Sequence, residues 1–285
     1  MVVVGSGAIG SEFAFLYASL GVKVTVVEYM PQFMPLLDAE VSAAAERAFR
    51  RQRITVMTDT AVKSVSIADN KCVVEVEQKG ETKQIVADKV LSAVGIKSNI
   101  EGLNLASVGV QVERDKIVVD RNFRTNIPSI FAVGDIIASP ALAHIASAEA
   151  VNCVECIFGQ NPPAIDYSLT PACIFTTPEI ASVGLTEEQA QKQGIEYKVA
   201  RYNFASSGKA AAAGDRDGFV KLIFDKGNKL RGAHIIGANV VEMLGEPSLA
   251  MAMGATAEDL ARTIHAHPSL YEGIYEAAKS LENEK

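Results

Sequence analysis

The fold is decided by two nearby stretches, Met1-Val2-Val3-Val4-Gly5-Ser6-Gly7-Ala8-Ile9-Gly10 and Val22-Lys23-Val24-Thr25-Val26-Val27-Glu28. The short apolar run before Gly5 is typical of a strand buried on both faces of a parallel sheet. Apolar side chains then recur at helical spacing, at Ile9, Phe13, Leu16, Tyr17 and Leu20, and Gly21 ends that helix. We expect this apolar stripe to face a sheet. The second stretch predicts another strand, so together they form a β-loop-α-β unit.

The three glycines of the loop each have a mechanical role. Gly5 makes the tight turn, Gly7 lets a pyrophosphate approach the backbone, and Gly10 lets the helix pack close to the strand. The helix N-terminus offers free N–H groups to the phosphates. Glu28 ends the second strand, where a carboxylate can bind both ribose hydroxyls and would repel a 2′-phosphate. The unit therefore predicts a dinucleotide site that favours NAD over NADP; a glycine-rich turn without a ligand is the alternative.

The rest of the chain divides into two regions. The first is predicted to hold a helix at 38–52, a strand at 54–56, a β-meander at 61–67, 72–78 and 82–86, a strand at 89–94, a strand-rich segment at 111–137 and a helix at 141–158. Asn161-Pro162-Pro163 marks a boundary. After it, helices that begin at capping residues Thr186 and Thr256 and a hairpin at 219–224 and 230–236 indicate an α+β region. The predicted fold class is α/β: a Rossmann-like domain with an inserted meander, followed by an α+β domain.

Composition excludes several classes of protein. The 285 residues carry 27 Lys and Arg against 34 Asp and Glu, a formal net charge of −7, which disfavours binding to nucleic acid. The only short basic run is Arg47, Arg50, Arg51 and Arg53 on one predicted helix. No apolar run approaches the roughly 18 residues of a membrane span. Four cysteines in so long a chain form no disulfide framework and favour the reducing cytoplasm. We also expect no metal site.

Two features admit both a structural and a functional interpretation. Cys153 and Cys156 have a Cys-x-x-Cys spacing, but they lie within an apolar helical pattern and not at a helix N-terminus, so we expect buried structural cysteines. Glu12 lies in the first helical turn, where a carboxylate compensates the helix dipole. A place for Glu12 beside a nicotinamide needs more support than spacing gives.

A series of motifs then occurs in order: Gly5–Glu12, Val26–Glu28, Ser92–Gly95, Thr125–Asp135, Leu142–Glu149, Phe175–Thr186 and His265–Pro268. In these the chain resembles the pyridine nucleotide-disulfide oxidoreductases and, among them, the dihydrolipoyl dehydrogenases. The resemblance runs nearly end to end but covers only the C-terminal part of such an enzyme. It implies an NAD-binding domain at 1–117, a remnant of the FAD-binding and central domain at 118–160, and an interface (dimerisation) domain at 161–285.

The resemblance also implies roles for particular residues. The implied NAD contacts are Gly5, Ser6, Gly7, Ala8, Ile9, Gly10, Ser11, Glu12 (beside the nicotinamide), Glu28, Val62 and Gly95. The implied FAD contacts are Asp135, Ala141, Leu142, Ala143 and His144. The implied catalytic pair is His267, as base, with Glu272 holding it. Ile96-Lys97-Ser98 departs from the family, in which many members carry Arg and Pro after the glycine.

Reasoning from the residues supports the catalytic pair only in part. A neutral imidazole is the natural base near pH 7, and a carboxylate on its other nitrogen fixes the tautomer. Pro268 suits the first turn of a helix, which would put Glu272 about one turn onward. Spacing alone favours a structural His-Pro turn, and the resemblance reverses that preference. We expect His265 to be a structural neighbour.

Family members open with a second Gly-x-Gly-x-x-Gly for FAD and a Cys-x-x-x-x-Cys redox disulfide, and neither occurs in these 285 residues. The expected function is part of an enzyme that oxidises dihydrolipoamide through a disulfide and FAD and reduces NAD⁺. We expect a homodimer through residues 161–285, with the lipoyl domain of a 2-oxo acid dehydrogenase complex as partner. The chain by itself is expected to bind NAD, to bind little FAD and to be inactive. A non-catalytic NAD-binding and dimerisation module, or another disulfide reductase of the family, is the alternative.

Overall fold

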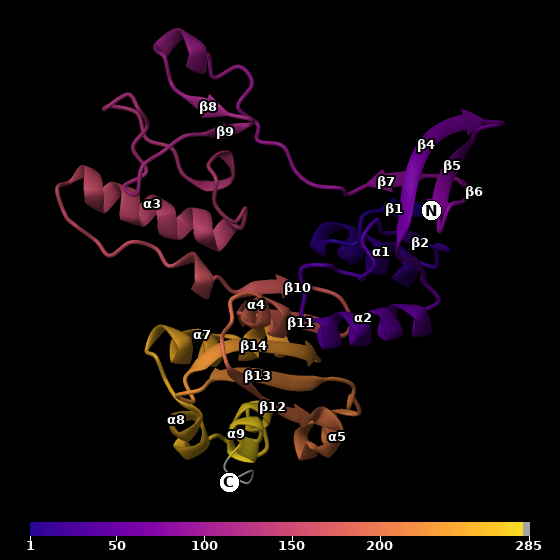
Figure 1. The fold of residues 1–285 in the computed structure, drawn as a ribbon. Coiled ribbons are helices and arrows are strands. Elements are labelled where there is room, and N and C mark those ends of the chain that lie inside the picture. Colours follow the sequence, from indigo (N-terminus) through magenta and orange to yellow (C-terminus); the bar gives the residue numbers. More distant parts are fainter. Residues whose placement is uncertain (282–285) are drawn as a thin grey trace. The chain divides into compact units, whose positions relative to one another are not determined.

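A computed structural model describes residues 1–281 and divides into two compact units (Figure 1). One unit contains residues 1–95 and the chain from residue 171 onward, and the other contains residues 96–170. Among the described residues, no helix combines the length and apolar character needed to cross a bilayer. The functional boundaries at residues 117 and 160 stay predictions.

A four-stranded parallel sheet forms the first part of the larger unit. Its strands are β1 (Val2–Val4), β2 (Thr25–Val27), β3 (Thr55–Met57) and β7 (Val90–Ser92), in the order β3-β2-β1-β7. Helix α1 (Ala8–Ser19) links β1 to β2, and helix α2 (Ala39–Arg51) links β2 to β3. The antiparallel meander of β4 (Thr60–Ala68), β5 (Lys71–Gln78) and β6 (Glu81–Ala87) precedes β7. The prediction of a Rossmann-like fold with an inserted meander is confirmed.

The expected orientation of α1 is wrong. Ile9, Phe13, Leu16 and Leu20 are 50%, 39%, 46% and 70% exposed, whereas the buried residues of this helix are Gly10, Ser11 and Ala14. Small side chains face the sheet because the helix packs close to β1. The apolar spacing identified the helix but not its buried side.

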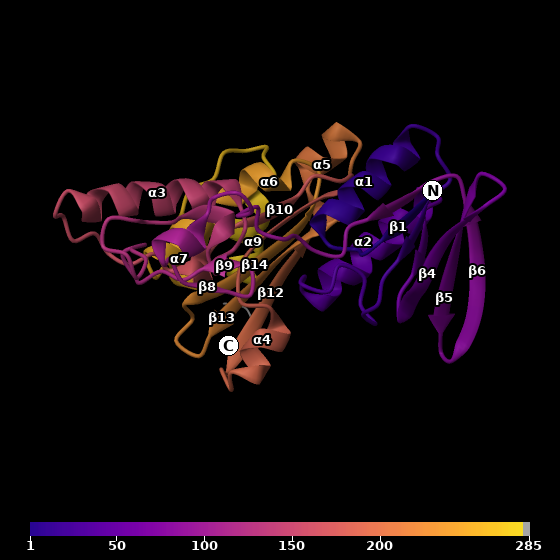
Figure 2. The ribbon, with the colours of Figure 1, turned by 90° about the horizontal axis from the view of Figure 1, so that it is seen from above.

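A five-stranded antiparallel sheet forms the second part of the larger unit (Figure 2). Its strands follow the order β10 (Ala172–Ile174), β11 (Glu179–Gly184), β14 (Leu230–Gly237), β13 (Phe219–Asp225) and β12 (Tyr197–Asn203). The helices are α4 (Glu187–Lys192), α5 (Gly208–Ala213), α6 (Val240–Met243), α7 (Gly245–Ala252), α8 (Ala257–Arg262) and α9 (Glu272–Ser280). Thr186 and Thr256 both form capping boxes, and the hairpin is β13–β14, so these predictions are confirmed.

Helix α2 joins the two sheets of this unit. Phe49 of α2 is fully buried in a cluster that also contains Val26 of the parallel sheet and Phe219 and Ile236 of the antiparallel sheet. Near the start of the helix, Lys221 Nζ lies 2.8 Å from the Asp38 carboxylate, and both side chains are only 1% exposed. Glu40 and Glu187 approach the same ammonium group at 3.2 and 3.4 Å. A buried cation therefore ties α2 to β13.

The smaller unit is less regular than expected. Its segment 111–137 contains only the two short strands β8 (Val112–Glu113) and β9 (Lys116–Ile117) and one isolated bridge, so the prediction of a strand-rich segment is wrong. The apolar residues of this segment pack against helix α3 (Ala143–Ile157) without forming long ladders. Cys153 is buried in that core, where burial raises the pKa of its thiol, as expected for a structural cysteine, whereas Cys156 is only partly buried.

Candidate active site

A hollow of about 600 Å³ lies where β1, β2 and β7 end. Six of the residues predicted to contact NAD line it: Gly5, Ser6, Gly7, Glu28, Val62 and Gly95. Ligands of open α/β sheets bind outside the carboxyl ends of the strands, which is where this hollow opens. The structure thus brings together residues from the loop, β2, the meander and β7 at the expected edge.

Glu28 is held in place by the glycine loop itself. Its Oε2 accepts hydrogen bonds from the Ser6 backbone N–H (2.8 Å) and from the Ser6 hydroxyl (2.7 Å). Its Oε1 accepts from the Met30 N–H at 2.8 Å, and the residue is 6% exposed. A carboxylate has about four lone-pair sites, two on each oxygen, so these three hydrogen bonds leave one acceptor site, on Oε1. The carboxylate is therefore preoriented, with negative charge at the wall of the hollow.

The glycines differ in what surrounds them. A Cβ added at Gly7 would meet nothing within 4 Å, whereas one at Gly10 would lie 2.1 Å from the Gly5 carbonyl oxygen. Gly5 has a φ of +93°, which side-chain-bearing residues rarely adopt. Gly5 and Gly10 are thus required by the fold, while the space beside Gly7 is left for a ligand. The open space beside Gly7 is therefore compatible with a pyrophosphate lying against the loop.

Helix α1 begins at Ala8, directly after Gly7, and no side chain caps it. Ala8, Ile9 and Gly10 occupy its first turn, where N–H groups lack helical partners and attract anions. Ser11 is buried, and its hydroxyl donates to the Ser6 carbonyl oxygen at 2.9 Å, which braces the loop. Glu12 accepts a hydrogen bond from the Phe175 N–H at 2.9 Å, so it also connects α1 to the end of β10.

Several residues that line the hollow carry no sequence signal. Tyr29 and Met30 follow Glu28, and Thr60 and Lys63 belong to the meander. Lys63 also pairs with Glu77 at 3.0 Å. The place of Thr60 and Lys63 in the site depends on where β4 lies relative to the parallel sheet, so spacing along the chain could not have identified these two residues.

The structure brings His267 and Glu272 together. The His267 Nδ1 and the Glu272 Oε1 are 2.8 Å apart, and the imidazole is 79% exposed. Glu272 also accepts from the Ser269 N–H at 2.9 Å, and this N–H together with the imidazole lowers the pKa of the Glu272 carboxyl group. Helix α9 begins at Glu272, so the expected helical turn at Pro268 is wrong and a loop makes the approach. An ionised carboxylate on Nδ1 leaves Nε2 as the basic nitrogen.

His265 has a different environment from His267. Its Nε2 lies 2.8 Å from the Glu246 Oε1, its Nδ1 lies 2.9 Å from the Thr263 carbonyl oxygen, and its side chain is only 7% exposed. Both ring nitrogens are therefore engaged inside the protein. This agrees with the structural role expected for His265.

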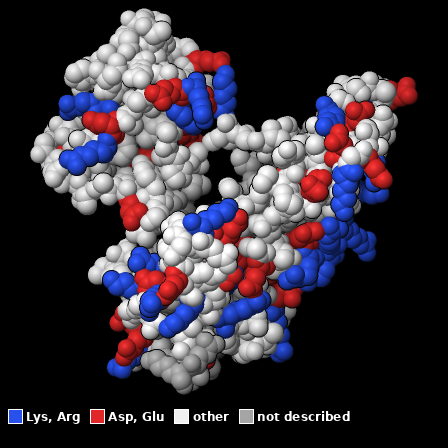
Figure 3. Space-filling model, in the orientation of Figure 1, with Lys and Arg blue, Asp and Glu red and all other residues white. Residues whose placement is uncertain are grey.

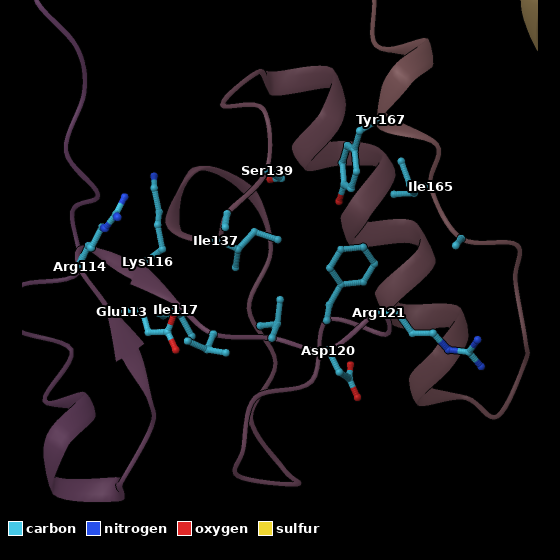
Figure 4. Close-up of a pocket in the computed structure, with 15 residues that line it drawn as sticks. Glu113, Arg114, Lys116, Ile117, Asp120, Arg121, Ile137, Ser139, Ile165 and Tyr167 are labelled. Atoms are coloured by element: carbon cyan, nitrogen blue, oxygen red, sulfur yellow. The ribbon is translucent and has the colours of Figure 1, made fainter. Parts of the chain in front are cut away.

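The residues expected to contact FAD lie in the smaller unit. Asp135 is exposed, and its carbonyl oxygen accepts from Lys116 Nζ (2.7 Å) and Ser98 Oγ (3.0 Å). Ala141 and Leu142 precede α3, and Ala143 and His144 begin it. A hollow of about 660 Å³ in this unit is lined by residues such as Ile137, Ser139 and Tyr167 (Figure 4). None of the five residues expected to contact FAD lines it. The five residues expected to contact FAD thus come from the turn at Asp135 and from the start of α3.

Glu149 supports the turn that carries Asp135, a role the sequence did not reveal. The Glu149 side chain is fully buried, and its Oε2 accepts from the Gly134 N–H at 2.6 Å. Its Oε1 accepts from the Tyr167 hydroxyl at 2.7 Å. Burial and then this carboxylate raise the pKa of Tyr167 to about 12. The only indication of this role in the sequence is that Glu149 is a carboxylate within an apolar helical pattern.

A parallel sheet with a glycine loop at its edge, joined to an antiparallel domain that carries an exposed His–Glu pair, defines a dinucleotide-binding oxidoreductase. The comparisons with known proteins agree. The family model described as pyridine nucleotide-disulphide oxidoreductase matches residues 1–150, and the dimerisation domain of the same family matches residues 170–278. The chain belongs to this family of FAD- and NAD-dependent oxidoreductases.

Similar proteins include dihydrolipoyl dehydrogenase of Chlorobaculum tepidum, 45% identical over 280 residues, and that of Mycobacterium leprae, 42% identical over 284 residues. These alignments cover 98% and 99% of this chain but 60% and 61% of the relatives. Among solved structures, LpdA from Mycobacterium tuberculosis has a TM-score of 0.89 at 28% identity, covering 98% of this chain and 61% of that one. The HOCl-induced flavoprotein disulfide reductase RclA from Escherichia coli has a TM-score of 0.88 at 26% identity, covering 98% and 64%. The chain thus spans about three fifths of the curated relatives' length.

Proposed function

We propose that this chain provides the NAD-binding and dimerisation parts of a dihydrolipoyl dehydrogenase. The observation that carries the proposal is the 2.8 Å contact between His267 and Glu272 in a chain 45% identical to an enzyme of that name. The whole enzyme oxidises dihydrolipoamide and reduces NAD⁺. FAD, when bound, would supply the relay that passes electrons from the dithiol, formed when the disulfide is reduced, to the nicotinamide.

The dinucleotide end of the proposed site uses the glycine loop. The N–H groups at the start of α1 bind the pyrophosphate, and the space beside Gly7 lets it approach the backbone. Glu28 would accept a ribose hydroxyl at the free site of Oε1 and repel a 2′-phosphate. Val62 and Gly95 line the same hollow. NAD is therefore the preferred nucleotide.

The substrate end of the proposed site uses the imidazole. Glu272 holds Nδ1, so the exposed ring can take a thiol proton from dihydrolipoamide at Nε2 and Glu272 stabilises the resulting cation. The thiolate then reduces a disulfide. These 285 residues contain no Cys-x-x-x-x-Cys pair, so the proposed reaction needs a disulfide from residues outside them.

The dimer is proposed to form through residues 161–285, with a lipoyl domain as the substrate-bearing partner and the cytoplasm as the location. Leu249, Met253 and Ile264 are 66%, 77% and 97% exposed and line a hollow of about 490 Å³ beside His265. Apolar surface of this kind marks interfaces. The proposed base His267 follows His265 by two residues, so it is suited to serve the disulfide of the opposite subunit.

The proposal is tested with the purified 285-residue chain. Titration with NADH and NADPH, followed by nucleotide fluorescence, is expected to show saturable binding with a preference for NADH. Glu28→Gln removes the charge but keeps an acceptor for the Ser6 N–H, and it is expected to reduce this preference; Glu28→Arg is expected to shift it towards NADPH. Unchanged selectivity in both variants would overturn the ribose assignment.

A second measurement tests whether the flavin- and disulfide-dependent part of the proposed reaction needs residues outside these 285. The chain alone is expected to show no flavin absorbance near 450 nm and no dihydrolipoamide:NAD⁺ turnover, while sedimentation shows a dimer. Saturable turnover would contradict the proposed dependence on an external disulfide. NADH binding by a monomer without turnover would favour a nucleotide-binding module over an enzyme part.

A further inference from the structure

A separate hollow of about 260 Å³ lies in the larger unit, between α2 and the strands β12 and β13. Four arginines from three segments line it: Arg47 and Arg51 of α2, Arg201 of β12, and Arg216 of the turn before β13. The buried side chains Phe219 and Ile236 form its apolar part. None of its lining residues also lines the hollow at the glycine loop.

Two of these arginines have acidic partners. The Arg51 guanidinium lies 2.6 Å from the Asp217 carboxylate, and Arg201 pairs with Glu40 while lying over the Phe219 ring, 4.2 Å from its centroid. These contacts hold both guanidinium groups at the wall of the hollow. Exposed ion pairs of this kind contribute little to stability, so their role here is to fix position.

Arg47 and Arg216 have no acidic partner among residues 1–281. Arg50, on the same helix, shows the usual arrangement for a solvated arginine, because it pairs with Glu46 four residues earlier at 2.7 Å. Arg47 instead has Ala43 four residues before it and Arg51 four residues after it. Like charges at this spacing are unfavourable. Arg47 and Arg216 therefore add unbalanced positive charge to the hollow.

The charge of the hollow contrasts with that of the chain. The formal net charge is −7, yet Lys and Arg gather over α2 in the space-filling view (Figure 3). Four arginines and one carboxylate, Asp217, line the hollow, so its lining has a net positive charge. A concave surface with an excess of one sign of charge raises the local concentration of oppositely charged ligands. An anion in this hollow would relieve the repulsion among the guanidinium groups.

We propose that this hollow binds a compact phosphate-bearing anion, either inorganic pyrophosphate or a small phosphate ester. The planar guanidinium fork matches phosphate oxygens in a bidentate arrangement. The volume lies below the roughly 300–1,000 Å³ of pockets for drug-sized ligands, which favours a small anion. Convergence from three segments makes the site a product of the folded unit and not of the basic run on α2 alone.

The test is calorimetric titration of the 285-residue chain with pyrophosphate and with glycerol phosphate, at constant ionic strength. Saturable binding is expected. The double substitution Arg47→Gln with Arg216→Gln is expected to weaken it by about tenfold or more, or about 1.4 kcal/mol. The matched control is Arg50→Gln with Arg53→Gln, which also removes two positive charges, at and just beyond the end of α2 and outside the hollow, and should leave binding within about twofold.

The variant Gly7→Ala distinguishes binding at the glycine loop from binding in the arginine hollow. It should weaken NADH binding and leave pyrophosphate binding in the arginine hollow unchanged. The double arginine variant should do the reverse. Absence of saturable binding up to about 10 mM, which corresponds to only about −2.7 kcal/mol, would overturn the proposal. Loss of pyrophosphate binding in Gly7→Ala but not in the arginine variant would also overturn it. Tighter binding of poly-glutamate than of either phosphate would assign the surface to an acidic protein segment instead.

Discussion

Gly7 and Gly10 are both glycines of one loop, yet the structure predicts opposite consequences for the same substitution. Gly7 has a φ of −62° and ψ of 179°, which any residue adopts, and an added Cβ meets nothing within 4 Å. Gly10 faces β1, where an added Cβ would lie 2.1 Å from the Gly5 oxygen and 3.3 Å from the Ala93 Cβ. Gly7→Ala should therefore affect the ligand, and Gly10→Ala should affect the fold.

The magnitudes follow from these distances. At Gly10 the new methyl group would be 1.3 Å inside the 3.4 Å where ordinary contact begins, and the obstacle is backbone. Such overpacking costs about 1–3 kcal/mol or more, which exceeds the roughly 1 kcal/mol gained from alanine's helix propensity. At Gly7 the reduced entropy of the unfolded chain offsets the poorer N-cap, so stability should change by less than about 1 kcal/mol. The Gly7 methyl group occupies the approach of the pyrophosphate, and NADH affinity should fall about tenfold or more.

The assays are urea unfolding followed by circular dichroism and NADH titration followed by fluorescence, on both variants and the parent chain. Gly7→Ala is expected to unfold at the same urea concentration as the parent chain and to bind NADH poorly. Gly10→Ala is expected to unfold at lower urea. Normal NADH binding by Gly7→Ala would refute the use of this loop for the pyrophosphate, and parent-like stability of Gly10→Ala would refute the close packing of α1.

Two further predictions concern charged pairs. Lys221→Met should lower the free energy of unfolding by about 3–5 kcal/mol at neutral pH, because it leaves the Asp38 carboxylate buried without its cation. Burial opposes ionisation of both groups, but their mutual hydrogen bond and attraction lower the pKa of Asp38 and raise the pKa of Lys221. The contribution of the pair is therefore full between the ordinary values of 3.8 and 10.5, and it is lost as the pH falls through the lowered pKa or rises through the raised one. Urea unfolding across pH checks this, and equal pH dependence in the variant would contradict it. His267→Gln should raise the pKa of the Glu272 carboxyl group towards its ordinary value, measured by NMR, because the carboxylate loses the imidazole that lies at its Oε1, whereas the control Glu246→Gln should not. Equal shifts in both variants would contradict the pairing.

Local sequence rules predicted the elements of the fold well. The glycine loop, the meander and both capping boxes follow from residues only a few positions apart, so their patterns can be read directly. The prediction of strands throughout segment 111–137 was wrong, because an apolar run indicates burial but does not show that a neighbouring strand pairs with it. The prediction that the stripe from Ile9 to Leu20 faces the sheet was wrong for a related reason. Helical spacing identifies an apolar face but does not show what covers that face.

The candidate site was predictable where a motif has a fixed local geometry. Gly5, Gly7 and Glu28 lie in the predicted hollow because one β-loop-α-β unit places all three. Lys63 and Glu149 were missed, since each reaches its site from an element whose position depends on distant contacts. The His267–Glu272 pair was predicted in part. The sequence suggested both residues, but the predicted helical turn at Pro268 between them is a loop in the structure.

The sequence by itself determined the class of this protein, because a phosphate-binding loop between strand and helix needs particular glycines at particular spacings. It also indicated the family, through motifs that recur in order along the chain. Only the tertiary structure decided which face of α1 is buried, that Lys221 ties α2 to β13, and that arginines from three segments meet in one hollow. The first feature depends on how closely α1 packs on its sheet, and the other two on packing and charge between residues more than a hundred positions apart. A local sequence pattern contains no information on such contacts.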